Sequence, residues 1–411
     1  MRLTGKKVLL AVTGGIAAYK SISLLRLLTA EGADVRVIAT PSAVKIAGFS
    51  AFETFSGHPL LSEVFSPVEN PTATQVAHIE WARWADLVLV APCTAHTAAK
   101  LAAGFADDLL SLVFLATKAP RVVVPAMNCA MYESATVRRS LETLKRDGVS
   151  VVEAGSGFLA CGETGKGRMP EPEELLEICF DLLSPAPAKG TVVVVAGRTE
   201  EPIDPVRVLT NRSSGKTGLE IACAFRAAGW KVKTVLGPCE TPYPAWCDVV
   251  RVRTALEMEA AAKKAFRAAD AAVMVAAVAD FRPAEAKPEK IKRSRAMKIL
   301  KLVPNPDILA ELSAKKKRRQ VVAGFALETV SPMENGAKKI LAKGCDLMAV
   351  NDPTARGKGG FGEATVECAL LRRRRDCVEE LLPLATRGKG ELAAALAAET
   401  ERILAEERPG C

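Results

Sequence analysis

The chain has few aromatic residues and only three histidines. Phe, Trp and Tyr make up 5% of its 411 residues, and they are not interleaved with the basic runs 315–319 and 372–375. Because unpaired bases bind by stacking on aromatic side chains, this composition does not favour nucleic acid as a partner. The net charge of +9 is better explained by small phosphorylated ligands, since basic groups attract anions of any kind.

Long apolar runs and paired cysteines are also absent. The longest apolar runs, such as 271–279, are well short of the ~20 residues that span a membrane, so no membrane association is expected. The chain has 11 cysteines, an odd number, and no two of them are spaced as C-x-x-C. This argues against a disulfide framework or a zinc cluster. We therefore expect a cytoplasmic protein. The basic N-terminus runs directly into a strand and a glycine turn, unlike a signal peptide.

Length and composition indicate two α/β domains. A chain of 411 residues is long for one hydrophobic core. Residues 184–190, S-P-A-P-A-K-G, form a Pro/Ala connector between a predicted helix and a new strand, which is typical of a linker. The predicted domains are residues 1–183 and 191–411. In both, apolar strands alternate with amphipathic helices, as in parallel sheets covered by helices.

Small polar residues follow each predicted strand of the first domain. Ligands bind at the edge where the carboxyl ends of parallel strands meet. The turn Thr13-Gly14-Gly15 leads into a helix expected from Ile16 to Glu31. Without the full G-x-G-x-x-G spacing, this turn indicates a weak site for one phosphate and no dinucleotide fingerprint. The strands and the polar residues after them are 6–12 with Gly14, 34–39 with Thr40, 86–91 with Thr94, and 122–125 with Asn128.

Three residues of this domain are candidates for catalysis. Asn128 follows V-V-V-P, where its amide could donate and accept hydrogen bonds; alternatively it only caps the next helix. His78 is expected on a helix, where a lone histidine is more commonly a partly buried structural residue. Cys161 lies among the five glycines of residues 155–169, which predict a mobile flap, or else a plain surface loop. An exposed thiol on such a flap could donate a proton.

Four motifs of this domain together resemble the flavin-containing cysteine decarboxylases, in particular those that act on phosphopantothenoylcysteine. They are G-G-I-A-A-Y-K, A-H-I-E, P-A-M-N-C-A-M-Y and A-C-G-E-T-G-K-G-R-M. The resemblance implies a flavodoxin-like fold with FMN. Its implied catalytic residues are His78 as base or orienting group, Asn128 as the clamp of the substrate carboxylate, and Cys161 as proton donor. The matching flavin contacts are Gly14, Gly15, Ile16, Ala17, Thr40, Thr94 and Ala126, while Cys93 and His96 depart from the family pattern.

The chemistry explains why such a decarboxylase needs a flavin. Loss of carbon dioxide directly from a cysteinyl carboxylate would leave an unstabilised carbanion. Oxidation of the thiol to a thioaldehyde-like group first creates an electron sink, and the hydride returns after carbon dioxide has left. The resemblance therefore implies oxidation, decarboxylation and reduction in that order.

The second domain also places polar residues after its predicted strands. Strand 191–196 leads to R-V-L-T-N-R-S-S-G-K-T-G, followed by a helix over 219–228. G-K-T is not a Walker A loop, because Thr210 stands where that motif requires glycine, but the Ser/Gly-rich helix start could still hold a phosphate. A buried strand is expected over 271–279, before Asp280. We also expect a helix with Asn305 as N-cap and Pro306 in its first position, a strand over 363–373 and a helix over 391–407.

These segments resemble phosphopantothenate-cysteine ligases in D-P-V-R-V-L-T-N-R-S-S-G-K-T-G, A-A-V-A-D-F-R, P-E-K-I-K, N-P-D-I and G-F-A-L-E. The resemblance implies a Rossmann-like domain in which CTP and Mg²⁺ activate 4'-phosphopantothenate as an acyl-cytidylate that cysteine attacks. By this resemblance Asn211 contacts the acyl intermediate, Lys290 stabilises phosphoryl charge and Arg207 binds the pantothenate phosphate. Arg198 departs from the family pattern, and metal ligands remain unknown. The matching nucleotide contacts are Met274, Val275, Ala276, Asp280, Asn305, Pro306, Asp307, Ile308, Phe325, Lys339 and Lys343.

The order of the two domains, decarboxylase first and ligase second, fits the bifunctional enzymes of coenzyme A biosynthesis. The resemblance implies a homo-oligomer in which first domains form trimers and second domains form dimers, giving a dodecamer. One alternative is a flavin reductase or a prenyltransferase-like relative, against which the sequence around Cys161 argues. Another is a pair of regulatory nucleotide-binding modules without turnover, which would leave Cys161, Asn128 and Lys290 without a shared purpose.

Overall fold

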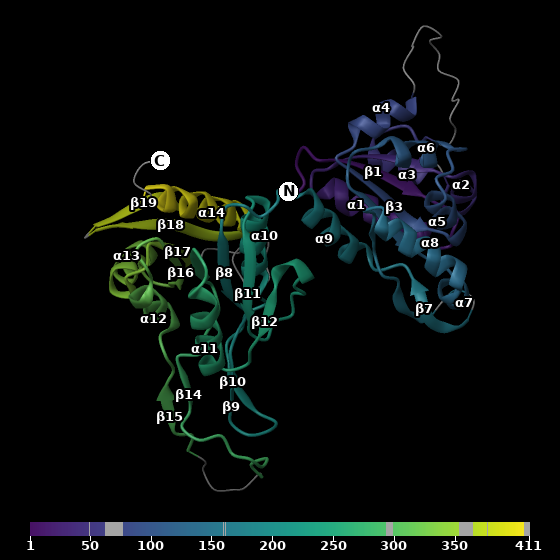
Figure 1. Cartoon of the computed structure of the whole chain (residues 1–411). Coiled ribbons are helices and arrows are strands. Elements are labelled where there is room, and N and C mark those ends of the chain that lie inside the picture. Colours follow the sequence, from purple (N-terminus) through teal and green to yellow (C-terminus); the bar gives the residue numbers. More distant parts are fainter. Residues whose placement is uncertain are drawn as a thin grey trace. The chain divides into compact units, whose positions relative to one another are not determined.

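The chain folds into two compact units, Met1–Leu183 and Ser184–Cys411 (Figure 1). The structure is a computed structural model. It describes residues 1–48, 50–61, 77–158, 160, 162–292, 299–352, 365–375 and 377–406. Within these ranges, no helix combines the length and the apolar character that crossing a membrane requires.

The first unit contains a five-stranded parallel sheet with the order β2-β1-β3-β4-β5. This is the flavodoxin-like order, and it confirms the predicted fold. β1, β3 and β4 are rich in Val and Leu and almost completely buried, because helices cover both faces of a parallel sheet. The strands are β1 (Lys7–Val12), β2 (Asp34–Ala39), β3 (Leu87–Cys93), β4 (Arg121–Pro125) and β5 (Ser150–Val151).

Helices connect the strands and pack in pairs, with α1 against α9, α4 against α6 and α5 against α8. The buried side chains of the second and third pairs join β1, β3 and β4 in one apolar cluster. The helices are α1 (Ala18–Ala30), α2 (Pro41–Ala47), α3 (Ser50–Ser56), α4 (Ala77–Trp84), α5 (Ala95–Ala102), α6 (Leu109–Ala116), α7 (Cys129–Glu133), α8 (Ala135–Arg146) and α9 (Pro172–Leu183).

The element boundaries of this unit differ only locally from the predicted ones. β2 matches its predicted range, whereas β3 extends to Cys93. β4 begins at Arg121 and ends at Pro125, and the N–H of Ala126 donates to the Cys93 carbonyl at 3.0 Å. The helix expected from Ile16 begins at Ala18, because the preceding residues form the turn.

Residues 155–158 and 164–168 form an antiparallel pair of strands, called here the β6–β7 hairpin. β6 (Gly155–Phe158) pairs with β7 (Thr164–Arg168). Gly167 has a φ of +148°, and a Cβ there would lie 2.3 Å from the carbonyl oxygen of Met127. Close packing therefore requires glycine at this position. Cys161, between the two strands in the sequence, lies outside the described residues.

The second unit contains an eight-stranded sheet with the order β12-β11-β8-β13-β16-β17-β18-β19. Its first six strands are parallel. Numbered along the chain they have the order 3-2-1-4-5-6, which confirms the predicted Rossmann-like fold. The strands are β8 (Thr191–Ala196), β11 (Lys231–Leu236), β12 (Val249–Arg251), β13 (Ala271–Met274), β16 (Val321–Leu327), β17 (Leu347–Asp352) and the antiparallel pair β18 (Thr365–Arg374) and β19 (Cys377–Gly388).

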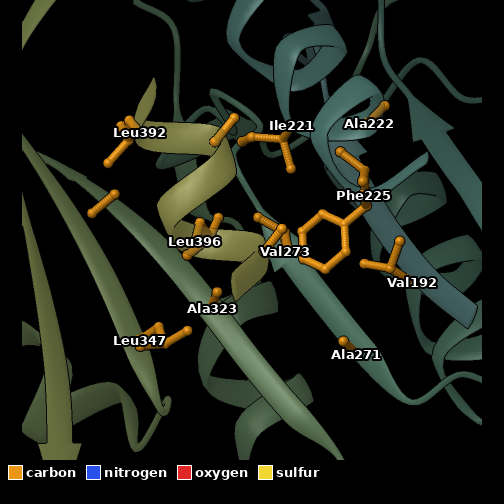
Figure 2. Packing of buried hydrophobic residues seen from close by; sticks show 14 of the residues in the cluster. Val192, Ile221, Ala222, Phe225, Ala271, Val273, Ala323, Leu347, Leu392 and Leu396 are labelled. Carbon is orange, nitrogen blue, oxygen red and sulfur yellow. The ribbon is translucent and has the colours of Figure 1, made fainter. Parts of the chain in front are cut away.

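Alternate residues of the central strands enter two cores, one on each face of the sheet. Val192 and Val194 pack with α10 and α14, whereas Val193 and Val195 pack with α11, α12 and α13. Figure 2 shows the first core, in which the ring of Phe225 from α10 lies between the strands and α14. The helices are α10 (Lys216–Ala227), α11 (Ala255–Phe266), α12 (Ile308–Lys315), α13 (Pro332–Lys343), α14 (Lys389–Glu406) and the short 3-10 helix η1 (Ala245–Cys247).

Two small antiparallel ribbons complete the second unit. In one, β9 (Glu200–Pro202) pairs with β10 (Val208–Thr210). In the other, β14 (Phe281–Pro283) pairs with β15 (Leu302–Pro304). Each begins a few residues after a strand of the large sheet, so both ribbons extend from its carboxyl edge.

Two predictions for this unit are wrong, and one strand is missing from the prediction. The strand expected over 271–279 ends at Met274. Asn305 and Pro306 are not the N-cap and first residue of a helix: Asp307 is the N-cap of α12, and its side chain accepts from the backbone of the third helical residue. The amide of Asn305 instead donates to the carbonyl of Ala279 at 2.7 Å. β19 is not predicted at all, because its acidic pair and Pro383 hide the strand pattern.

We expect Phe225→Ala to destabilise the second unit by about 3–5 kcal/mol, the usual cost of a large cavity in a core. Phe225 is fully buried, and its ring meets that of Trp230 edge-on at 5.5 Å. Urea unfolding followed by tryptophan fluorescence measures the change. Phe281→Ala, at an exposed position, is the control and should change the stability by less than about 0.5 kcal/mol. A loss below about 1 kcal/mol for Phe225→Ala would contradict the packing described.

Candidate functional sites

The carboxyl ends of the first unit's strands bring the predicted cofactor residues into one row. Thr40 and Ala126 each donate a backbone hydrogen bond of 3.0 Å to the neighbouring strand. The N–H of Thr94 donates to the hydroxyl of Thr13, also at 3.0 Å. These contacts join the ends of β1, β2, β3 and β4 into the crevice that a flavodoxin-like sheet offers to ligands.

The glycine turn lies close to this row. A Cβ on Gly14 would lie 2.3 Å from the Cβ of Ser42, and one on Gly15 would lie 3.4 Å from the Thr94 methyl group. Helix α1 then starts without a side-chain cap at Ala17. Uncapped N–H groups at a helix start can bind a phosphate, so the start of α1 can present backbone donors to an anion. The N–H of Gly15 is not one of them, because it donates to the Thr13 carbonyl at 2.8 Å.

Two threonines at this edge cap helices. The hydroxyl of Thr40 accepts from the backbone of α2, and that of Thr94 accepts from the backbone of α5. A hydroxyl that accepts in this way still has a proton to donate to a ligand. The two departures from the family pattern lie around Thr94. Cys93 is buried in the core, where burial raises the pKa of its thiol, and His96 is exposed on α5.

Asn128 is both an N-cap and a donor to an anionic group. Its Oδ1 accepts from the N–H of Ala130 at 2.8 Å, so the expected cap of α7 is present. Its Nδ2 donates to Oε2 of Glu163 at 2.7 Å. Because the cap requires oxygen toward Ala130, the amide nitrogen must face the other way, toward the hairpin.

The β6–β7 hairpin contacts this turn at several points. The N–H of Met127 donates to the Gly167 carbonyl at 3.0 Å, and a Cβ on Gly165 would lie 2.8 Å from the Cβ of Cys129. At the end of the hairpin, the buried ammonium of Lys20 donates to the Met169 carbonyl at 3.0 Å. The strand that follows Cys161 in the sequence is thereby held near Asn128.

His78 is half-buried on the first turn of α4. Within the described residues, no hydrogen bond joins its ring to the Asn128 turn. The structure thus brings the glycine turn, Thr40, Thr94, Ala126 and Asn128 to one edge, but it does not connect His78 to them through such a contact.

The second unit has a cavity of about 620 Å³ at the carboxyl edge of its sheet. It lies where the strand order reverses, between β8 and β13, which is the usual ligand site of this fold. The walls come from the ends of β8, β16 and β17, from residues 211–218 and from residues 275–278 after β13. The lining residues that the sequence predicts are Asn211, Val275, Ala276, Asp280, Phe325 and Lys339.

The other predicted nucleotide contacts lie outside this cavity lining. Met274 and Ile308 are buried in the core. Lys343 forms an ion pair with Asp307, the cap of α12. Asn305 is close to the rim, because its N–H donates to the carbonyl of Asp280 at 2.8 Å. Pro306 follows Asn305 and precedes the cap.

Arg207 and Lys290 lie together in a second region, formed by two loops. The Arg207 guanidinium is 3.0 Å from Oδ2 of Asp204, which also accepts from the N–H of Ile291 at 3.1 Å. Burial alone would raise the pKa of Asp204, but three backbone donors and Arg207 hold the pKa below its usual range. Asp204 therefore ties the loop of Arg207 to the segment of Lys290, whose side chain is exposed.

Sequence reasoning missed two supporting residues of the cavity. Nη1 of Arg198 donates to the carbonyl of Ser213 at 2.9 Å and pairs with Glu240 at 3.0 Å, so this departure from the family pattern supports the loop at residues 211–216. Lys389 is a buried lysine in the cavity wall. It begins α14 directly after β19, so the missed strand concealed its position.

Comparisons with known proteins agree with this division. The family described as Flavoprotein matches residues 1–184. The family described as DNA/pantothenate metabolism flavoprotein C-terminal domain matches residues 188–403. Residues 1–403 are therefore matched almost continuously by these two families.

Two curated relatives are similar over most of their length. The "Coenzyme A biosynthesis bifunctional protein CoaBC" of Escherichia coli (strain K12) is 41% identical over 364 residues, which cover 87% of this chain and 89% of the relative. The Bacillus subtilis (strain 168) protein of the same name is 40% identical over 368 residues, 88% of this chain and 89% of the relative. A solved structure, the C-terminal domain of a CoaBC protein, is 32% identical, covers 54% of this chain and 99% of its own, and has a TM-score of 0.43.

We expect Arg198→Ala to loosen residues 211–216, since the loop loses a charged hydrogen bond to a backbone carbonyl. Amide hydrogen exchange in this loop, measured by mass spectrometry, should accelerate by about tenfold. Arg253→Ala is the matched control: Arg253 pairs with Glu200 at 3.3 Å in an exposed position, so its loss should leave the exchange unchanged. Equal exchange in both variants would show that Arg198 does not support the loop.

Proposed function

The chain belongs to the family of bifunctional coenzyme A biosynthesis proteins, and on this premise we propose which unit carries out which reaction. The chain is a bifunctional enzyme, a phosphopantothenoylcysteine decarboxylase and a phosphopantothenate-cysteine ligase. The second unit ligates cysteine to 4'-phosphopantothenate with CTP, and the first unit decarboxylates the product to 4'-phosphopantetheine. The main support is the identity of 40–41% over relatives that span both units.

The first unit fits FMN at the row of strand ends. The uncapped start of α1 with Gly14 and Gly15 suits its phosphate, and Thr40, Thr94 and the backbone of Ala126 suit polar groups of the remaining molecule. When bound, FMN supplies the reversible hydride transfer that gives the decarboxylation its electron sink. The chain's own residues bind the substrate, orient it and move protons.

Asn128 suits the clamping of the substrate carboxylate. Its oxygen is held by the cap of α7, so it presents nitrogen and acts as a donor. A donor that is already oriented needs no rearrangement when the carboxylate arrives, which favours binding in a single pose. Cys161, which lies between β6 and β7 in the sequence, is the proposed proton donor after carbon dioxide has left, and His78 is the proposed base or orienting group.

The second unit fits a nucleotide in the cavity at its switch point. Helix α10 starts after Gly215, which has a φ of +81° and no side-chain cap, so its N–H groups can bind phosphate oxygens. Lys339 and Lys389 add positive charge to the walls. Mg²⁺ is usually held by one or two carboxylates and by substrate phosphates. Asp280 lines the cavity and is the proposed carboxylate.

The acyl transfer requires the loops of Arg207 and Lys290 in addition to the cavity. The side chain of Lys290 is exposed. Asp204 connects its segment to the loop of Arg207, because it accepts a hydrogen bond from Ile291 and pairs with Arg207. The proposed roles are stabilisation of the activated phosphoryl group by Lys290, binding of the pantothenate phosphate by Arg207 and contact of Asn211 with the acyl group.

A homo-oligomer is part of this proposal. Ile16 and Tyr19 beside the glycine turn, and Met131 in α7, are exposed apolar side chains near the proposed flavin site. Apolar surface beside a ligand site supports coverage by another copy, as in the expected trimers and dodecamer. None of the described cysteines forms a disulfide, and the cytoplasm is the proposed location.

Asn128→Ala should stop the decarboxylase and spare the ligase. With FMN-loaded enzyme, CTP, Mg²⁺, cysteine and 4'-phosphopantothenate, we expect release of carbon dioxide to fall at least about a hundredfold, since an oriented donor is lost. Pyrophosphate formation should stay within about twofold of the parent protein, because the two sites lie in separate units. Loss of both activities in a folded variant would contradict independent sites.

Lys290→Gln should depress the ligase alone. We expect pyrophosphate formation to fall about 10²–10³-fold, as is usual when one charge-stabilising donor is removed. Decarboxylation of added phosphopantothenoylcysteine should be unchanged. Lys287→Gln is the control, since Lys287 lies three residues away and pairs with Glu285 at 2.7 Å in an exposed position. Ligation at the full rate in Lys290→Gln would remove Lys290 from its proposed role.

A further inference from the structure

One carboxylate of the chain lies on the group that is proposed to bind the substrate's carboxylate. Oε2 of Glu163 accepts from Nδ2 of Asn128 at 2.7 Å and from the thiol of Cys129 at 3.1 Å. The Cys129 thiol is the donor and the carboxylate the acceptor, and this hydrogen bond raises the pKa of the thiol. Two donors of the turn thus meet at one carboxylate oxygen.

The hairpin holds Glu163 in this position. Glu163 immediately precedes β7, and β7 is fixed on the turn by the Met127–Gly167 hydrogen bond and by the close packing of Gly165 on Cys129. An exposed glutamate normally samples many rotamers, at a cost in entropy when it is fixed. Here the backbone on either side of the contact is already fixed, so this cost is reduced.

We propose that Glu163 is a specificity-determining residue that takes the place of the substrate's carboxylate on Asn128 and Cys129 whenever no carboxylated ligand is bound. This inference rests on the proposed function, in which Asn128 clamps that carboxylate. A carboxylated substrate must displace Glu163 and replaces its hydrogen bonds. The decarboxylated product has no group for this position, so Glu163 occupies it again.

The exchange of hydrogen bonds explains why Glu163 weakens the binding of the carboxylated substrate and not that of the product. The exchange of one carboxylate acceptor for another is nearly neutral in free energy, because each donor keeps an anionic acceptor. Before binding, Glu163 satisfies Asn128 and Cys129; in the complex the substrate does so. Carbon dioxide is uncharged and a poorer acceptor, so its formation returns these donors to Glu163. The substrate therefore competes with Glu163, and the product does not.

Two analogues that cannot react isolate this effect. N-(4'-phosphopantothenoyl)alanine has the carboxylate but no thiol, and 4'-phosphopantothenoyl ethylamide differs from it only by lacking the carboxylate. Their dissociation constants for the full-length, FMN-loaded enzyme are measured by titration calorimetry. The ratio of the two constants reports the selectivity for the carboxylate and cancels general effects on folding.

We expect Glu163→Ala to bind the alanine analogue roughly three- to tenfold more tightly, with unchanged affinity for the ethylamide. Glu163→Gln keeps the shape of the side chain without its charge. Its affinity for the alanine analogue should lie between those of the parent protein and Glu163→Ala. Glu153→Ala is the matched control, because Glu153 pairs with Lys166 of the same hairpin at 2.8 Å. Its ratio should equal that of the parent protein.

The opposite results would overturn the inference. If Glu163 served only to hold the hairpin on the turn, both analogues would bind Glu163→Ala more weakly and their ratio would not change. A parent enzyme that releases carbon dioxide, together with such an unchanged ratio, defeats this inference alone. A parent enzyme that neither releases carbon dioxide nor binds either analogue defeats the proposed function and the inference with it.

Discussion

A parallel strand that is covered on both faces can present polar groups only at its ends, and both units depend on this constraint. β1, β3 and β4 in the first unit and β8 and β13 in the second are almost fully buried. Polar side chains within them would lack hydrogen-bond partners, so chemistry is confined to the residues that follow. At the carboxyl edges these residues are Thr40, Thr94 and Asn128 in one unit and residues 275–280 in the other.

This constraint explains how much of the fold and of the sites the sequence could predict. Runs of valine mark buried strands clearly, and β2 and β8 have their predicted bounds. Once such strands are placed, the residues after them must share an edge, so the glycine turn, Thr40, Thr94 and Asn128 could be predicted as neighbours. Asn211, Asp280 and Phe325 likewise reach one cavity. The other site residues were predicted from the family motifs.

Features set by contacts between distant residues could not be predicted in this way. Asn305-Pro306 has the composition of a helix start, but Asn305 donates to Ala279, 26 residues earlier, and Asp307 caps the helix instead. β19 has no clear alternation because residues on both of its faces are partly exposed. The interaction of Glu163 with Asn128 spans 35 residues. No local pattern shows that a glutamate in a glycine-rich segment meets that particular amide.

The cap and the proposed ligand contact of Asn128 are not alternatives, because an amide has two chemically different ends. The oxygen satisfies the start of α7, and this fixes the direction of the nitrogen. A side chain that can only accept could cap the helix but could not donate to a ligand. The hydroxyl of Thr40 accepts from the backbone of α2 and still has a proton to donate. The hydroxyl of Thr94 accepts from the backbone of α5 and also lies 3.1 Å from that of Thr97, where either hydroxyl can be the donor. Residues that terminate the strands and begin the helices of this sheet are therefore already oriented for a ligand, and stability and function are combined in single side chains.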